Sequence, residues 1–71
     1  MSNHHTYRKI EIVGSSPISS DDAIRNALAK CSETIKNMDW FEVIETRGHI
    51  ENGHIGHFQV TLKVGFRLEN S

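Results

Sequence analysis

The dipeptide Asn52-Gly53, which lies between two stretches of alternating polar and apolar residues, restricts the fold of this chain more than any other feature. Asn-Gly favours a two-residue type I′ turn, because both central residues need a positive φ that matches the twist of antiparallel strands. We therefore expect a β-hairpin centred on residues 52–53. Counting outward from the turn predicts the cross-strand pairs Glu51 with His54, Thr46 with Gln59, Ile44 with Thr61, Glu42 with Lys63, and Trp40 with Gly65.

A strand and a helix are expected before the hairpin. Residues 7–13 mix charged and β-branched residues as strands do, and the run from Gly14 to Pro17 contains residues that favour turns. Ser19 followed three residues later by Asp22 resembles a capping box, which predicts a helix from about Ser20 to Asn37. Its apolar stripe has helical spacing and comprises Ala23, Ile24, Ala27, Leu28, Cys31, Ile35 and Met38.

The last predicted strand has one apolar face, and we expect it to form the core with the helix stripe. That face comprises Phe58, Val60, Leu62, Val64, Phe66 and Leu68, joined by Phe41 and Val43 from the preceding strand. Insertion of the last strand between the other two makes every neighbouring pair antiparallel. The expected fold is an α+β, β-α-β-β protomer with strand order 1-3-2 and one helix.

The chain of 71 residues allows one domain, over residues 1–71, with residues 1–5 as a flexible N-terminus. A single cysteine excludes an internal disulfide, and without a signal-peptide pattern we expect a cytoplasmic protein. The net charge of −1 gives no basic field for nucleic acid, and no apolar run is long enough for a membrane span. We expect neither partner.

The predicted hairpin is too long for its own helix to cover. A helix of about 18 residues spans roughly 27 Å, and a strand of about 14 residues spans roughly 46 Å. The distal residues Ile44, Ile50, Ile55 and Phe58 therefore need cover from another subunit. Because a three-stranded sheet of this size is a poor monomer, the sequence predicts a homo-oligomer.

Trp40 and Gln59 are the residues that suggest a ligand. Trp40 is expected on the face away from the helix, opposite Gly65, where its ring is suited either to a planar ligand or to a subunit interface. The Gln59 amide offers both a donor and an acceptor, which match the imide edge of a flavin or nucleobase. The two residues are separated by roughly 20 Å along the sheet, so one small ring can contact both only if the strand bends or a neighbouring subunit contributes.

Four stretches of the chain resemble the dodecins, small flavin-binding proteins of bacteria and archaea. They are Ile10–Ser16, Asp39–Val43, Arg47–Gly53 and Gln59–Glu69, and the resemblance extends from Tyr7 to Glu69. It implies a hollow homododecamer in which flavins stack in pairs between symmetry-related tryptophans.

Trp40 is the stacking residue that the resemblance implies, and Gln59 is the partner of the flavin's pyrimidine edge. Bacterial members favour FMN, with riboflavin and FAD as other flavins that stay open. Arg47 and Arg67 match the phosphate contacts, His49 lies at the ribityl and phosphate end, and Glu45 completes the set of expected binding residues. Some bacterial members also bind coenzyme A, for which the sequence offers no definite residues. A β-bulge between Val43 and Gly48, with Gly48 as a plausible site, would bring Arg47 to the same face as Trp40.

The expected function is flavin storage and sequestration, with Trp40 quenching the photochemistry of bound FMN. The sequence shows no nucleophile–base pair and no pair of carboxylates suited to catalysis. We interpret the acidic residues of the hairpin as solvated strand charges, namely Glu42, Glu45 and Glu51. We therefore do not expect an enzyme. Two alternatives stay open. One is a metal-binding oligomer that uses the histidines His4, His5, His49, His54 and His57, and the other is an interaction scaffold without a ligand.

Overall fold

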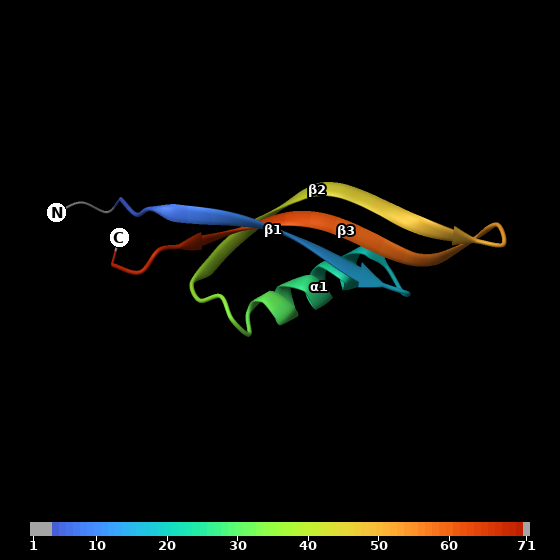
Figure 1. The fold of residues 1–71 in the computed structure, drawn as a ribbon, viewed down its shortest axis with the longest axis horizontal. Coiled ribbons are helices and arrows are strands. Elements are labelled where there is room, and N and C mark those ends of the chain that lie inside the picture. Colours follow the sequence, from blue (N-terminus) through green and yellow to red (C-terminus); the bar gives the residue numbers. More distant parts are fainter. Residues whose placement is uncertain (1–3, 71) are drawn as a thin grey trace.

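The computed structural model describes residues 4–70, which form one antiparallel sheet with a helix on one face (Figure 1). The elements are β1 (Tyr7–Ser16), α1 (Ser20–Cys31), β2 (Met38–Glu51) and β3 (His54–Arg67). The strand order is β1-β3-β2, which confirms the predicted β-α-β-β topology. Residues 1–3, which belong to the N-terminal segment expected to be flexible, lie outside the described residues.

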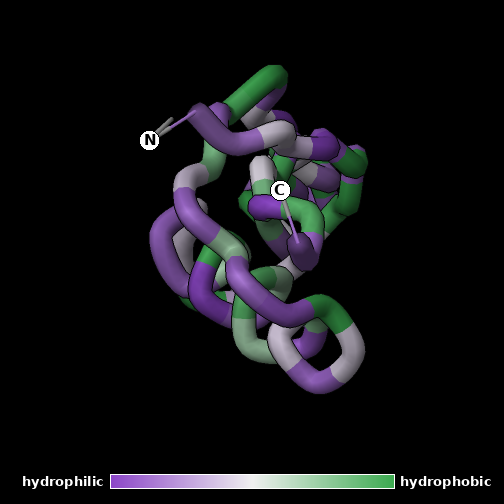
Figure 2. Tube along the Cα trace, turned by 90° about the vertical axis from the view of Figure 1, so that its left-hand side faces the viewer, coloured by the Kyte–Doolittle hydropathy of each residue, from purple (hydrophilic) through white to green (hydrophobic). Residues whose placement is uncertain are grey.

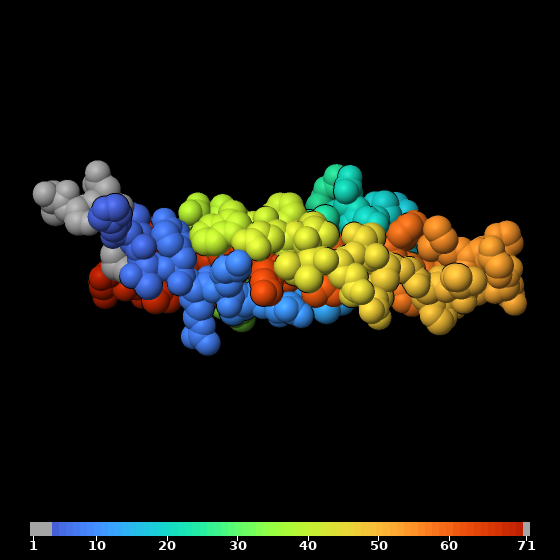
Figure 3. Space-filling model, turned by 90° about the horizontal axis from the view of Figure 1, so that it is seen from above, coloured from blue at the N-terminus to red at the C-terminus, as the bar shows by residue number. Residues whose placement is uncertain are grey.

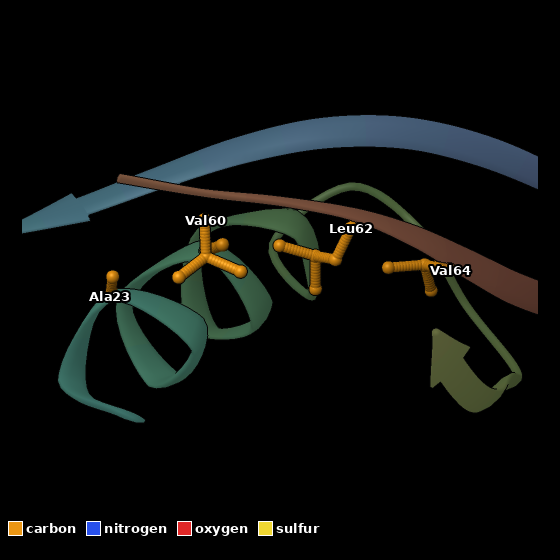
Figure 4. Close-up of a cluster of buried hydrophobic side chains, with 5 residues drawn as sticks. Ala23, Val60, Leu62 and Val64 are labelled. Atoms are coloured by element: carbon orange, nitrogen blue, oxygen red, sulfur yellow. The ribbon is translucent and has the colours of Figure 1, made fainter. Parts of the chain in front are cut away.

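The core lies between α1 and the strands β1 and β3 (Figure 4). It consists of the buried side chains Ala23, Ala27, Val60, Leu62 and Val64. Alanines on the buried side of α1 let the helix lie close to the sheet, and Gly14 of β1 is also buried there. A Cβ at Gly14 would overlap the Ala23 carbonyl and lie 2.7 Å from the Cβ of Ala27. Glycine is therefore needed at this helix–strand contact.

The helix begins as predicted and ends earlier than predicted. Ser19 caps it by accepting a hydrogen bond from the Asp22 N–H at 3.0 Å. Beyond Cys31 the chain forms a turn, and the Ser32 hydroxyl donates to the Ala29 carbonyl at 2.7 Å. Side chains such as Ser and Thr compete for backbone hydrogen bonds and weaken a helix, and Asn37 then adopts a φ of 64°. The predicted end at Asn37 is therefore wrong. With 12 residues, α1 is not long and apolar enough to cross a membrane.

The hairpin turn is confirmed, with positive φ at both Asn52 and Gly53. The pairs Glu51–His54, Glu42–Lys63 and Trp40–Gly65 are also confirmed. Between them, the predicted pairs Thr46–Gln59 and Ile44–Thr61 are wrong, because the register shifts by one residue between His49 and Ile50 and returns between Val43 and Glu45. Thr46 faces Val60, Arg47 faces Gln59, and Glu45 faces Thr61.

The helix side of β2 and the distal hairpin are left open. The molecule measures 59 × 20 × 14 Å, and the hairpin extends beyond the helix (Figure 3). Phe41 and Val43, expected in the core, are about half exposed because α1 packs on β1 and β3 instead. Leu68, also expected in the core, lies beyond the end of β3 and is exposed. Ile50 is 75% exposed and Ile55 61%, as the length comparison predicts. Figure 2 shows hydrophobic and hydrophilic residues intermixed along the trace.

Candidate functional site

The face of the sheet opposite α1, called the outer face below, carries most of the predicted binding residues. Directly paired residues share a face, so Trp40 lies there with Gly65. Before Ile44, the even-numbered residues of β2, such as Trp40 and Glu42, lie on the outer face. Ile44 is an extra residue that bulges from β2, so from Glu45 onward the odd-numbered residues lie on the outer face instead. A bulge in the predicted segment is confirmed, although it lies at Ile44 and not at Gly48.

Trp40 lies flat against the backbone of β3. A Cβ at Gly65 would overlap three atoms of the indole ring, so only glycine allows this contact. Tyr7 of β1 packs edge-on against the ring, with centroids 5.3 Å apart and an interplanar angle of 66°. The indole N–H donates to the Glu42 carboxylate at 3.0 Å. These contacts fix the ring while leaving Trp40 37% exposed.

Glu42 connects Trp40 to β1. Its carboxylate also pairs with the Lys9 ammonium at 3.0 Å. The hydrogen bond from Trp40 lowers the pKa of Glu42 below its usual range, and Lys9 lowers it further. The Glu42 side chain is still 42% exposed, as expected of a solvated strand charge, but its contacts with Trp40 and Lys9 were not predicted. Its role went unpredicted because a contact between residues 40 and 42 depends on side-chain rotamers, whereas the strand pattern reports only a shared face.

Arg47 and Gln59 form the second group on the outer face. They are paired directly across β2 and β3. The Arg47 guanidinium binds the Glu45 carboxylate at 3.0 Å, which holds it beside the Gln59 position. Gln59 lies six positions before Gly65 along β3, or about 20 Å at the usual rise per residue. Within one protomer, the structure does not bring Trp40 and Gln59 together.

Arg67 and His49 lie at opposite ends of β3 and β2. Arg67 is exposed and pairs with Tyr7, and its backbone N–H donates to the Asn37 carbonyl at 3.1 Å. His49 stacks on His57, with ring centroids 5.2 Å apart and an interplanar angle of 16°. Among residues 4–70, no three histidine, cysteine or carboxylate side chains converge into a ready metal site.

Known proteins match the chain along nearly its whole length. A family model described as Dodecin matches residues 6–69. The dodecin of Thermus thermophilus is 46% identical over 65 residues, which cover 92% of this chain and 94% of that protein. The solved dodecin of Streptomyces davaonensis is 56% identical with a TM-score of 0.91, covering 97% of this chain and 100% of the other. The dodecin of Streptomyces coelicolor is also 56% identical, with a TM-score of 0.90 and full coverage (100%) of both chains. The chain therefore belongs to the dodecins, a family of oligomeric, non-enzymatic binding proteins that generally bind flavins.

Proposed function

We propose that this protein stores FMN by stacking the isoalloxazine ring on Trp40, in sites built from more than one protomer of a homododecamer. The single observation that carries the proposal is the indole ring itself, held against Gly65 and by its hydrogen bond to Glu42, and still partly exposed. A flat aromatic surface that needs no reordering is well suited to bind a planar ring.

Gln59 supplies the polar contact in this proposal. A flavin has an imide edge with one N–H between two carbonyl groups, and the Gln59 amide offers the complementary acceptor and donor. Because Gln59 lies about 20 Å from the Trp40 position in its own protomer, the Gln59 that acts with a given Trp40 comes from a neighbour.

The exposed apolar residues support an assembly. Ile50 and Ile55 of the distal hairpin and Phe41 and Val43 of β2 are left open by the helix. Apolar surface that a protomer cannot cover favours contact with other subunits. In our proposal, the same contacts that cover this surface also complete the flavin sites of the dodecamer.

The phosphate of FMN is assigned to the arginines. Arg47 and Arg67 are both exposed, and a guanidinium can bind a phosphate through two parallel hydrogen bonds. Glu45 orients Arg47, and His49 lies two residues further along the same face. The arginines favour FMN over riboflavin, which lacks the phosphate. FAD stays open as another flavin, and no residues are assigned to coenzyme A.

Storage with quenching follows from the chemistry of stacked rings. Trp40 donates an electron to the photoexcited flavin, and the electron then returns, so that both rings end in their original oxidation states. Burial of the flavin between subunits keeps it from side reactions. The protein then limits the reactivity of a cofactor and catalyses no reaction.

A titration of flavin-free protein with FMN, riboflavin and FAD tests the proposal. We expect FMN emission to fall strongly on binding, and FMN to bind more tightly than riboflavin. A colourless oligomer that leaves the emission of all three flavins unchanged would support the scaffold alternative and contradict our proposal.

The Trp40→Ala variant tests the stacking contact. Stacking of a base on an aromatic side chain contributes about 1–3 kcal/mol, so the variant should bind FMN roughly 5- to 150-fold more weakly and quench it less. Trp40→Phe is the matched control, because it keeps an aromatic ring at the same position, and it should bind FMN more tightly than Trp40→Ala does. Unchanged affinity and emission in Trp40→Ala would show that the flavin does not stack there.

A further inference from the structure

The distal hairpin carries two histidines and a glutamate close together next to its turn. His49 and His57 are paired directly across β2 and β3, and their rings stack with centroids 5.2 Å apart. The Glu51 carboxylate lies 3.9 Å from the Nε2 atom of His49. We propose that His49, His57 and Glu51 bind a divalent transition-metal ion of the zinc type, about 26 Å from the Trp40 position of the same protomer.

Gly56 brings these three side chains together in two ways. The register set by the turn pairs Ile50 with Ile55, and an unbroken count would place His49 opposite Gly56. Gly56 is the extra residue of a bulge, and so His57 faces His49 instead. In addition, a Cβ at Gly56 would lie 2.8 Å from the Cδ atom of Glu51, so the missing side chain makes room for this carboxylate.

The donor set suits zinc. Two imidazole nitrogens and one glutamate oxygen, with water as the fourth ligand, are an established tetrahedral arrangement for Zn²⁺. The rings now stack, and binding requires them to rotate until one nitrogen of each points to a common position. The side chains of His49 and Glu51 are 58% and 64% exposed and have room to do so. The nearby positive charge of Arg47 is compensated by Glu45 at 3.0 Å.

The proposed metal site is tested apart from the proposed flavin function. Within one protomer, His57 lies eight positions before Gly65 along β3, which places the histidine pair about 26 Å from the Trp40 position. His49 also belongs to the residues assigned to the phosphate end of FMN. The test therefore uses flavin-free protein, and its outcome is separate from the outcome of the FMN titration.

Calorimetric titration with Zn²⁺ tests the proposal, using the full chain with His4→Ala and His5→Ala so that N-terminal imidazoles do not contribute. We expect one ion for each protomer. Loss of even an outer partner of a ligand typically weakens metal binding 10- to 100-fold, so His57→Gln should weaken it at least about tenfold. His54→Gln, which removes the other imidazole of the same turn, is the matched control and should bind as the parent does.

Circular dichroism of each variant establishes that the sheet has formed before binding is compared. Failure of the parent to bind Zn²⁺, or equal binding by His57→Gln and the parent, would overturn the proposal. An equal loss in His54→Gln and His57→Gln would overturn the assigned set of ligands.

Discussion

Trp40 is held in one orientation by residues from all three strands. Gly65 of β3 lies under the ring, Tyr7 of β1 packs against it, and Glu42 of β2 accepts its N–H. The position of Trp40 opposite Gly65 could be predicted by counting from the turn. The contacts with Tyr7 and Glu42 could not, because they depend on rotamers and on a third strand whose register the sequence leaves open.

The lowered pKa of Glu42 predicts how Trp40 responds to acid. The hydrogen bond from Trp40 and the charge of Lys9 favour the ionised carboxylate of Glu42 in the folded state, and so they stabilise the fold. This stabilisation is present above the pKa that Glu42 has in the unfolded chain, and it is lost as the pH falls through the lower pKa of the folded state. Trp40 emission in flavin-free protein should therefore titrate with a midpoint below the usual glutamate value of about 4.3.

Two variants make this titration specific. Lys9→Gln removes the positive partner and should raise the midpoint, whereas Glu42→Gln keeps a hydrogen-bond acceptor and should abolish the transition. A midpoint at or above the usual glutamate value, or the same midpoint in Lys9→Gln, would contradict the role of Glu42.

At the scale of elements, the two register shifts explain why a simple count was right at both ends of the hairpin and wrong between them. Gly56 adds one residue to β3 and Ile44 adds one to β2, so the two offsets cancel before Trp40 is reached. Alternating polarity predicted the strands of the hairpin, the Asn52-Gly53 dipeptide predicted the turn, and antiparallel pairing of neighbours predicted the strand order. Bulge positions and the early end of α1 depend on local backbone conformations that a periodic pattern does not report.

The contact between β1 and α1 predicts a strong effect of one methyl group. Gly14→Ala forces the strand away from Ala23 and Ala27, and overpacking of this kind costs about 1–3 kcal/mol. We expect the thermal unfolding midpoint to fall by about 5 °C or more. Ser15→Ala, at the next position and exposed, is the control and should change the midpoint little. Equal midpoints for Gly14→Ala and the parent would show that the helix can move without cost.

At the scale of the whole molecule, the protomer is 59 Å long and its helix covers only part of the sheet. The short helix leaves more of the hairpin open than the sequence predicted. The same geometry separates Trp40 from Gln59, so a binding site that uses both requires neighbouring subunits. The separation could be predicted from strand length, whereas the arrangement of subunits depends on surfaces whose complementarity the sequence pattern does not encode.

Co-assembly of two defective variants tests the shared site most directly. The Trp40→Ala and Gln59→Ala variants are unfolded, mixed and refolded together. In the control, each variant is refolded separately and the two are then combined. FMN affinity and the quenching of FMN emission are compared between the two samples. If each site takes Trp40 from one protomer and Gln59 from another, a fraction of the sites in the mixed assemblies regains both residues, and tight, quenched FMN binding returns. If co-refolded and separately refolded samples bind FMN identically, the site is not shared between protomers and the account is wrong.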